Sequence, residues 1–585
     1  MIRRMIWRND GFLYKRLSDF SGDIIFSALS NSSPVKVYET EIWNSDKWDP
    51  MVYGVDISHS CPFFNQLKKL IFNVPWRASS VINSSNSDYS NNFTSFKNCY
   101  LCFNGSFSEN CAYSNGLGYS RDCFDCSHIN HSELCYESFW LSRCQKIFFS
   151  SRCKDSYDIY FSKDIRNCNN CFGCANLQNK SYCIFNQPYS KEGYFKKMIS
   201  FNIGSFSSLK ELIEQINKTW LKFPNRFMEG TKNIDVTGEY IFQSKHVHNS
   251  FLIREAEDIR FCQYLQEPAN KDCYDQTLFR GNELTYENAI TGDGTYNTKF
   301  SVLCWTNINN LEYCINCVSC GDCFGCVGLR NKEYCILNKQ YTKEEYEALV
   351  PKIIDHMNAM PYVDKKGRVY KYGEFFPPEL SPFSYNETIA QEYFPLTKEQ
   401  ALSQGYSWKD PEERNLKIDI KTEELPDLIK DVKDDIVGKV IECATARNWR
   451  RSDLRQISKG QSSGEFSNCT TAFKIIPQEM EFYRKMNLPL PRLCPNCRHY
   501  ERLKQRNPLK LWHRKCMCGG KTSANFGVRG VPDTANSKGS TFGNYKNTIE
   551  HFHKDQPCPN EFETTYAPDR PEIVYCEACY KQEVN

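Results

Sequence analysis

A single cysteine register runs through the first half of the chain and restricts what it can fold into. The twelve cysteines of this stretch all lie at multiples of three residues from one another: they are Cys99, Cys102, Cys111, Cys123, Cys126, Cys135, Cys144, Cys153, Cys168, Cys171, Cys174 and Cys183. An isolated β-strand repeats every two residues and an α-helix every 3.6, so neither produces this spacing. A coil with regular corners does, because equivalent positions on successive sides face the same way. The register therefore predicts a β-solenoid over residues 81–190.

The remaining positions of the same register indicate an inward face. They are mostly small or apolar, as at Ser108, Leu117 and Ile129. Corners are expected at Asn, Asp and Gly, which tolerate turn conformations. Predicted corners are Lys97-Asn98, Glu109-Asn110, Arg121-Asp122 and Arg166-Asn167. The handedness of the coil and the number of residues per coil stay open.

A second copy of this block follows the first. The segments CFGCANLQNKSYCIFNQPYSKEGY (171–194) and CFGCVGLRNKEYCILNKQYTKEEY (323–346) are identical at 15 of 24 positions, and each leads into a helical pattern. The second block is less regular, because Cys262, Cys273 and Cys304 do not share the spacing of three that runs from Cys314 to Cys326 and ends with Cys335. We expect the first solenoid over residues 81–190, a helical linker over 191–235, a second solenoid over 236–341, and a helix with an extended linker over 342–440.

The solenoid cysteines have three alternative uses. Free cysteine is among the most buried residues, so an inward ladder of thiols needs no metal. Repeated Cys-x-x-Cys pairs could instead hold zinc. The five cysteines from Cys314 to Cys326 also have the spacing of part of an iron–sulfur loop, although the x-x-x-Cys-Pro continuation is missing.

The cysteine total also bears on the compartment. It is odd, at 31, and the basic start of the chain is followed by no hydrophobic run. Both observations favour reduced thiols and a cytoplasmic protein over a disulfide framework. No apolar stretch approaches the roughly 18–20 residues that a membrane helix needs, so we expect no membrane association.

Residues 441–585 carry pairs with the spacing of metal ligands. Cys494-Pro-Asn-Cys497 and Cys576-Glu-Ala-Cys579 each let two sulfurs reach one zinc ion, and each pair needs two further ligands. We expect about two structural Zn²⁺ ions. The predicted sites are Cys443, Cys469, Cys494 and Cys497 for the first ion, and Cys558, Cys576 and Cys579 with either Cys516 or Cys518 for the second. His551 and His553 could replace a thiolate, and one of Cys516 and Cys518 is then spare.

A basic run overlaps the first of these pairs. Residues 484–515 contain ten Lys or Arg and one acidic residue, Glu501, although the whole chain carries a net charge of only +3. Such a run could bind phosphates while an aromatic ring stacks on a base. It could equally be a solvated helix, or a face that packs against the more acidic segment 409–437. The candidate nucleic-acid contacts are Arg498, Arg502, Lys504, Arg506, Trp512, Arg514 and Lys515.

Several long motifs resemble a known group of proteins. The runs IIPQEMEFYRKMNLPLPRLCPNCRH, RNPLKLWHRKC and EFETTYAPDRPEIVYCEACY, with NSDYSNNFTSFKNCYLCF and YGEFFPPELSPFSYNETIAQEYFPLTKEQA upstream, are similar to uncharacterised Cys-rich zinc-ribbon proteins of candidate-phyla-radiation (Patescibacteria-type) bacteria. The resemblance covers most of the chain. It implies zinc binding in an α+β ribbon or treble-clef-like domain over residues 441–585, and it implies no established activity.

The first 50 residues repeat the end of the chain without its cysteines. WRNDGFLYKRLS (7–18) parallels QRNPLKLWHRKC (505–516), and VYETEIW (37–43) parallels VYCEACY (574–580). Ser18, Glu39 and Ile42 stand where the later copy has Cys516, Cys576 and Cys579. We therefore expect a degenerate ribbon over residues 1–50 that folds without zinc by packing against its neighbours, followed by a connecting segment with a helix over 51–80.

The motifs favour a binding protein over an enzyme. The chain has no Gly-rich phosphate loop before Lys-Ser/Thr and no His-Glu-x-x-His. We expect a mainly β, non-enzymatic zinc protein whose basic ribbon surface contacts nucleic acid or the ribosome. The alternative is a solenoid scaffold that binds a protein partner, and a lower-ranked alternative is an enzyme with its site on the solenoid face. No small-molecule substrate is indicated.

Overall fold

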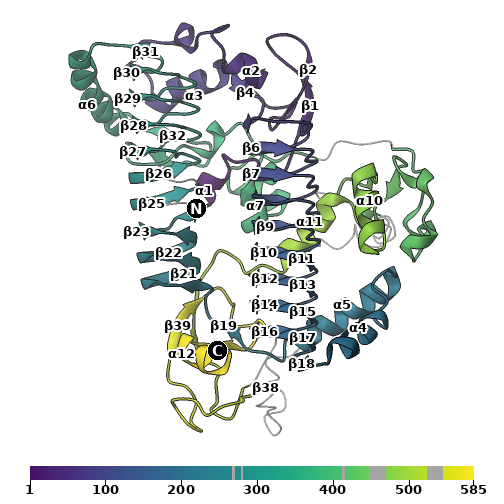
Figure 1. The fold of residues 1–585 in the computed structure, drawn as a ribbon. Coiled ribbons are helices and arrows are strands. Elements are labelled where there is room, and N and C mark those ends of the chain that lie inside the picture. Colours follow the sequence, from purple (N-terminus) through teal and green to yellow (C-terminus); the bar gives the residue numbers. More distant parts are fainter. Residues whose placement is uncertain (267–269, 279–280, 411–415, 447–468, 524–544, 585) are drawn as a thin grey trace. The chain divides into compact units, whose positions relative to one another are not determined.

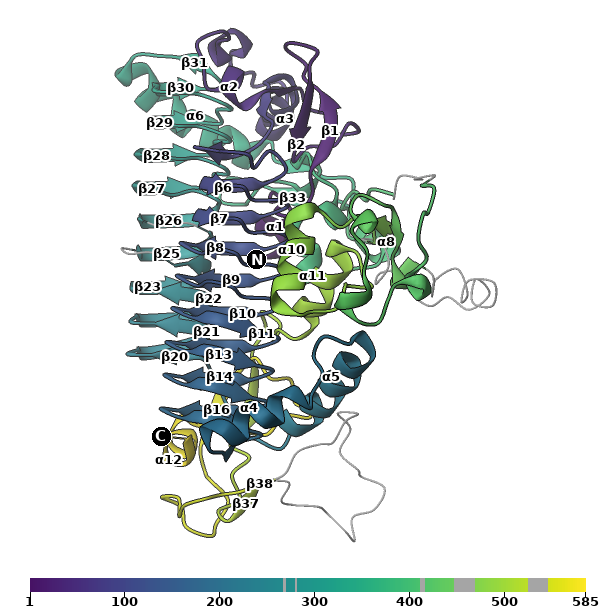
Figure 2. The ribbon, with the colours of Figure 1, turned by 45° about the vertical axis from the view of Figure 1, so that its right-hand side comes forward.

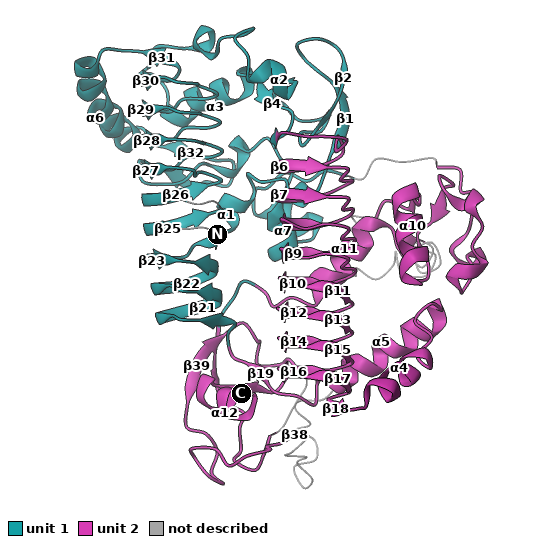
Figure 3. Ribbon diagram, viewed as in Figure 1, with its two compact units in different colours: residues 1–81, 228–410, 509–511 teal, residues 82–227, 411–508, 512–585 magenta. Residues whose placement is uncertain are grey.

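The computed structural model describes residues 1–266, 270–278, 281–410, 416–446, 469–523 and 545–584. The chain divides into two compact units, each assembled from separate stretches of sequence (Figure 3). Unit 1 comprises residues 1–81, 228–410 and 509–511, and unit 2 comprises residues 82–227, 411–508 and 512–585. Among the helices within the described ranges, none is both long and apolar enough to cross a membrane.

The first solenoid lies in unit 2 and confirms the predicted fold class. Its strands stack in parallel (Figure 1), and each pairs with the strand one coil further on: Asn91 lies opposite Phe103, Phe103 opposite Asn115, and Asn115 opposite Ser127. One coil therefore takes 12 residues. One sheet contains β6 (Asn91–Lys97), β7 (Phe103–Glu109), β8 (Asn115–Gly118), β9 (Ser127–Asn130), β10 (Phe139–Ser142), β12 (Ser151–Lys154), β14 (Lys163–Arg166) and β16 (Ala175–Gln178). The other contains β11 (Gln145–Phe148), β13 (Tyr157–Tyr160), β15 (Asn169–Phe172), β17 (Ser181–Ile184) and β18 (Gln187–Pro188).

Corners recur every three residues because the residue before nearly every inward position has a positive φ. The predicted corners behave in this way: φ is 52° at Asn98, 54° at Asn110, 52° at Asp122 and 48° at Asn167. Bulky residues such as Phe107 and Trp140 adopt the same conformation, although most L residues avoid it. Backbone hydrogen bonds between successive coils hold both sides of each corner, so the stack stabilises a conformation that the single residue disfavours.

Inward cysteines and serines make equivalent hydrogen bonds to the backbone. The Cys111 thiol donates to the carbonyl of Glu109 at 3.3 Å, and the Ser114 hydroxyl donates to the carbonyl of Ala112 at 3.0 Å. The Ser114 oxygen also accepts the backbone N–H of Cys126 at 3.0 Å. A small side chain with one donor thus satisfies each position, which explains why Cys and Ser interchange there. Burial raises the pKa of Cys126 to about 12, so its thiol stays protonated.

The second solenoid lies in unit 1 and has coils of uneven length. Successive partners from Lys245 to Asn309 are 12, 14, 12, 13 and 13 residues apart, and the last coils return to 12. Coils of 13 and 14 residues change the sequence spacing between inward residues, although these residues stay aligned in space. This explains why the cysteines of the second block do not share one register of three. The strands are β20 (Gly230–Thr231), β21 (Ile234–Phe242), β22 (Lys245–Arg254), β23 (Ala256–Arg260), β24 (Gln263–Leu265), β25 (Asn270–Thr277), β26 (Asn282–Ala289), β27 (Thr295–Lys299), β28 (Ile308–Glu312), β29 (Gly321–Phe324), β30 (Glu333–Ile336) and β31 (Lys339–Gln340).

Helices follow both solenoids where the sequence patterns predict them. α4 (Lys191–Ile199) and α5 (Phe206–Trp220) follow the first solenoid, and α6 (Lys343–Ala359) follows the second. Leu209 and Leu212 of α5 pack against Phe161 of the solenoid in one apolar cluster. The connecting segment before the first solenoid contains α3 (Phe63–Asn73), whose Phe63 and Phe64 join the core of unit 1.

The later part of unit 2 consists of short hairpins and helices. Figure 2 shows α10 (Pro477–Met486) and α11 (Pro495–Lys504) lying along the first solenoid. Phe482 packs against Phe124 there, and Tyr483 packs against Tyr136. β34 (Ile441–Glu442) pairs antiparallel with β35 (Ala472–Phe473), and β36 (Trp512–Lys515) with β39 (Glu561–Thr564). The helices are α10 (Pro477–Met486), α11 (Pro495–Lys504) and α12 (Glu577–Val584), and β40 (Val574–Tyr575) pairs with β19 (Asn225–Arg226).

Candidate metal centres

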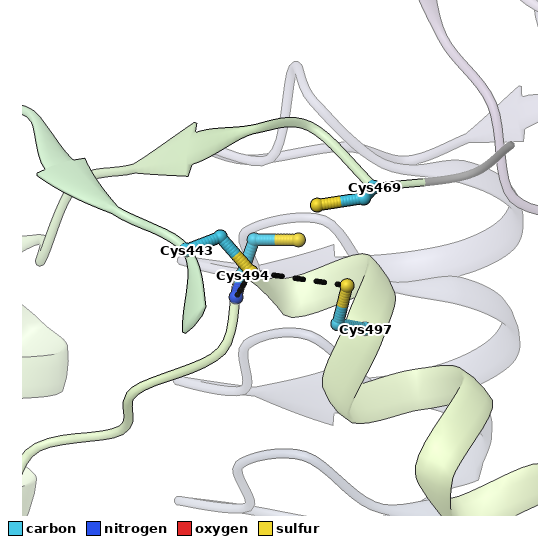
Figure 4. Close-up of side chains that lie close together, drawn as sticks. All are labelled: Cys443, Cys469, Cys494 and Cys497. Atoms are coloured by element: carbon cyan, nitrogen blue, oxygen red, sulfur yellow. Dashed lines mark hydrogen bonds between the residues drawn. The ribbon is translucent and has the colours of Figure 1, made fainter. Parts of the chain in front are cut away.

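Cys443, Cys469, Cys494 and Cys497 lie together in unit 2. Their Sγ atoms are all within 4.8 Å of one another, and those of Cys443 and Cys497 are 3.8 Å apart. A tetrahedral ion with Zn–S bonds of about 2.3 Å places its sulfur ligands about 3.8 Å apart. Figure 4 shows the side chains gathered around one point. This group, the one that the sequence predicts for the first ion, can hold a metal.

The β34/β35 hairpin explains how ligands far apart in sequence meet. Cys443 directly follows β34 and Cys469 stands three residues before β35, so antiparallel pairing brings both to the same end. The other two ligands bracket the start of α11, because Cys494 immediately precedes the helix and Cys497 lies in its first turn. The positive end of a helix dipole favours thiolates there. Hydrogen bonds with neighbouring thiols lower the pKa of Cys443 to about 7, and the bond with Cys469 has the largest effect.

The second group is Cys516, Cys558, Cys576 and Cys579, and it is built in the same way. All four sulfurs lie within 4.8 Å, with Cys558 and Cys576 3.8 Å apart. Cys516 directly follows β36, and Cys558 stands three residues before β39. Cys576 precedes α12, and Cys579 lies in its first turn. Cys516 therefore completes this quartet, and Cys518 is not part of it.

Cys518 belongs to a third group, with His551, His553 and Cys579. The four ligand atoms again lie within 4.8 Å of one another. Cys518 Sγ is 3.2 Å from His551 Nδ1, and Cys579 Sγ is 3.3 Å from His553 Nε2. From the spacing in the sequence, one of Cys516 and Cys518 is expected to be spare, and the histidines are possible substitutes for a thiolate. In the structure both cysteines and both histidines lie in groups that can hold an ion, and Cys579 is common to two groups.

Two basic residues predicted to contact nucleic acid are buried. Arg498 and Arg502 of α11 are 3% and 2% exposed. Asp125, at a corner of the first solenoid, lies between them, 2.9 Å from Arg498 Nη1 and 3.0 Å from Arg502 Nη1. Arg498 also pairs with Glu479 of α10, and Arg502 with Glu137 of the solenoid. Both guanidinium groups therefore serve to hold α11 on the solenoid.

The other predicted contacts lie around α11 and β36. Arg514 is mostly buried and donates to the carbonyl of Ala567 at 3.2 Å. Lys504 pairs with Glu501 at 2.9 Å, and Lys515 with Glu561 at 3.2 Å. Nucleic-acid contact stays a prediction and rests on the predicted contacts that are not buried. These are Lys504, Arg506, Trp512 and Lys515.

The solenoid cysteines do not form comparable groups. Among the described residues, no three of them have all their sulfurs within 4.8 Å of one another. The remaining group that could hold an ion is His246, Glu257 and Asp258 on the second solenoid, where all three side chains are half-exposed. Lys245 pairs with Glu257 there at 3.2 Å. The buried cysteine groups of unit 2 are therefore the strongest metal candidates.

The N-terminal segment of unit 1 has the chain path of the second group. β1 (Tyr14–Leu17) pairs antiparallel with β2 (Ile24–Ser27), as β36 does with β39. β3 (Val37–Tyr38) pairs in parallel with β4 (Trp76–Arg77) and leads into α2 (Thr40–Trp43), as β40 pairs with β19 and leads into α12. Single backbone hydrogen bonds match as well: Asp19 N–H to Val37 at 2.9 Å corresponds to Met517 N–H to Val574 at 3.0 Å.

A hydrogen bond occupies the place of the metal ligands in this N-terminal copy. The Ser18 hydroxyl, at the position of Cys516, donates to the Glu39 carboxylate, at the position of Cys576, at 2.6 Å. Ile42 stands at the position of Cys579. The N-terminal copy thus has the chain path of the second group, with a hydroxyl–carboxylate pair at two of the positions where that group has sulfur ligands.

Each copy also packs on the repeat that ends a solenoid. In unit 2, the Tyr580 hydroxyl of α12 donates to Asn176 Oδ1 at 3.1 Å. In unit 1, the equivalent residue Trp43 lies against Gly328, at the position of Asn176 in the repeat. A Cβ on Gly328 would lie 3.9 Å from the Trp43 ring and 3.5 Å from that of Trp48. Sequence reasoning did not find this contact, although both partners belong to segments that it recognised as repeated.

Comparison with known proteins adds no functional information. No model of a known protein family matches the chain, and no curated protein matches it.

Proposed function

We propose that this chain is a non-enzymatic zinc protein in which structural metal sites fasten α11 and α12 to the first solenoid, leaving the coils exposed for a partner. The observation that carries the proposal is the paired construction of the two cysteine quartets. Each joins a hairpin to a helix start, and the geometry of each suits one tetrahedral ion. Four sulfur ligands leave no position for a reacting water, so such sites contribute folding free energy. The same hairpin-and-helix build supports the resemblance to zinc-ribbon proteins.

Contacts beside both quartets support a fastening role. Behind the first, Arg498 and Arg502 enter a buried cluster of carboxylates on the solenoid and α10. Beside the second, Glu577 of α12 pairs with Arg226 of β19 at 2.6 Å, and Tyr580 reaches Asn176. Loss of either ion would free a helix start that positions these side chains.

An exposed aromatic ladder supports the partner-binding part of the proposal. Phe107 and Tyr119, on successive coils of the first solenoid, are 52% and 55% exposed. Their rings stack at 5.0 Å, and Tyr119 stacks on His131 at 4.8 Å. Stacked coils present extended surfaces of this kind to partners, and aromatic side chains supply much of the binding energy at protein interfaces.

Metal analysis of the full chain, purified with its thiols reduced, tests the structural-zinc proposal. We expect tightly bound zinc, at least one ion for each quartet. Chelation should make α11 and α12 susceptible to limited proteolysis while the strands of the second solenoid stay protected, because the ions contribute to folding only locally. A chain that holds no metal and shows the same proteolysis pattern with and without a chelator would refute the proposal.

Filter binding separates the proposed scaffold from a nucleic-acid protein. We expect the full chain to bind single-stranded RNA or DNA weakly, because two of the predicted basic residues are committed to buried ion pairs. Tight binding that weakens steeply between 50 and 300 mM salt, and that is lost on substitution of Lys504 and Arg506, would instead favour the nucleic-acid alternative.

A further inference from the structure

We propose that the second and third groups form one binuclear centre in which two zinc ions share the thiolate of Cys579. This deepens the proposed function and rests on it. One ion takes Cys516, Cys558, Cys576 and Cys579, and the other takes Cys518, His551, His553 and Cys579. With the Cys443 group, the chain then binds three ions, one more than the sequence predicts.

Hydrogen bonds hold each histidine in the tautomer whose unprotonated nitrogen faces a cysteine sulfur of the group. His553 Nδ1 lies 2.5 Å from the carbonyl oxygen of Gln556, which can only accept, so Nδ1 carries the hydrogen. The lone pair of His553 is therefore on Nε2, which faces Cys579 Sγ at 3.3 Å. His551 is oriented in the reverse sense. Its Nε2 lies 3.0 Å from the Glu583 carboxylate, which leaves the lone pair on Nδ1 facing Cys518 Sγ at 3.2 Å.

A carboxylate behind a histidine is the usual second layer of a zinc site, because it fixes the ring and strengthens the nitrogen ligand. The side chains of His551 and Glu583 are both fully buried. Glu583 is itself held by the Tyr545 hydroxyl at 2.5 Å and the Thr548 N–H at 2.8 Å. A surface histidine with a chance neighbour has no such support.

The charge of the centre also suits two ions. The five cysteines of the combined groups supply five thiolates, and the histidines are neutral ligands, so two divalent cations leave a net charge of −1. Side-chain amides donate toward the sulfurs, from Asn547 to Cys518 at 3.2 Å and from Asn560 to Cys576 at 3.3 Å. A single ion in the Cys516 quartet would leave Cys518 and both histidines buried or half-buried beside it with no ion to bind.

Counting ions by native mass spectrometry of the reduced full chain is the first test. We expect three zinc ions in the unaltered protein, two in Cys518→Ser and in His551→Gln, and one in Cys579→Ser. Matched controls are Cys61→Ser and His513→Gln, which lie outside the groups and should keep three. Two ions in the unaltered protein would overturn the shared centre and leave the proposed function standing, whereas no ions would overturn both.

Cadmium-113 NMR of the unaltered full chain tests the sharing itself and does not depend on how the variants fold. We expect three resonances, two of them split by scalar coupling to each other through the Cys579 sulfur and the third unsplit. Decoupling one of the split resonances should collapse the other. Three bound ions without any mutual splitting would contradict a shared thiolate.

Discussion

Serine at Cys494 is expected to abolish the first metal centre, whereas serine at Cys111 is expected to leave the protein nearly unchanged. Both substitutions replace one sulfur atom by an oxygen atom in a buried side chain of unit 2. At Cys494 the sulfur is one of four ligands, and a zinc site of this kind contributes on the order of 10 kcal/mol to folding of its surroundings. At Cys111 the thiol donates one hydrogen bond to a carbonyl, which a hydroxyl can make equally well.

The adjacent inward positions along the chain already show that serine suits the solenoid interior. Ser108 and Ser114 stand at inward positions on either side of Cys111 and donate to carbonyls two residues back at 3.0 Å. We therefore expect Cys111→Ser to retain every ion and to change the free energy of unfolding by about 1 kcal/mol or less. Cys494→Ser should retain one ion fewer and expose α11 to protease. Equal effects of the two substitutions would mean that sulfur has one role throughout the chain.

The solenoids were predictable because their geometry repeats within a few residues. A side chain that faces inward at every third residue leaves a periodic trace of Cys, Ser and Ile, and no distant contact is needed to read it. The coil length was not readable, because a spacing of three fits any coil whose length is a multiple of three. The register of the second block could not be recognised for a related reason. Its coils of 13 and 14 residues keep the inward side chains aligned in space, but they break the spacing of three in the sequence.

The sequence predicted which residue types could bind metal, but only partly which of them share one ion. The Cys494–Cys497 and Cys576–Cys579 pairs fix two ligands locally, but a counting argument gives each ligand to one ion. Membership of Cys579 in two groups lies outside such an argument, so the sequence left one of Cys516 and Cys518 without a role. The burial of Arg498 and Arg502 could not be predicted for another reason: both pair with Asp125, more than 370 residues away, and no local sequence pattern indicates that pairing.

Replacing Arg502 with methionine is expected to destabilise unit 2 by about 3–5 kcal/mol, because it removes one partner of a buried ion cluster. The cluster holds Arg498 and Arg502 against Asp125, Glu137 and Glu479. Without Arg502, three carboxylates share one guanidinium. Lys504→Met is the matched control on the same helix, where the ammonium group and Glu501 are both more than half exposed and the expected change is about 0.5 kcal/mol or less.

The cost of the Arg502→Met substitution should also depend on pH. Burial already raises the pKa of Glu137 to about 7 with Arg502 present, and removal of that cation raises it further. A carboxyl group whose pKa is higher in the folded than in the unfolded chain favours folding most while it is protonated, and this stability is lost as the pH rises through the folded pKa. The difference in unfolding free energy between Arg502→Met and Lys504→Met should therefore become smaller from pH 8 to pH 6. It can be measured from the hydrogen exchange of the α11 amides at increasing urea concentrations. A difference that stays constant or widens toward pH 6 would show that Arg502 acts through packing and not through its charge.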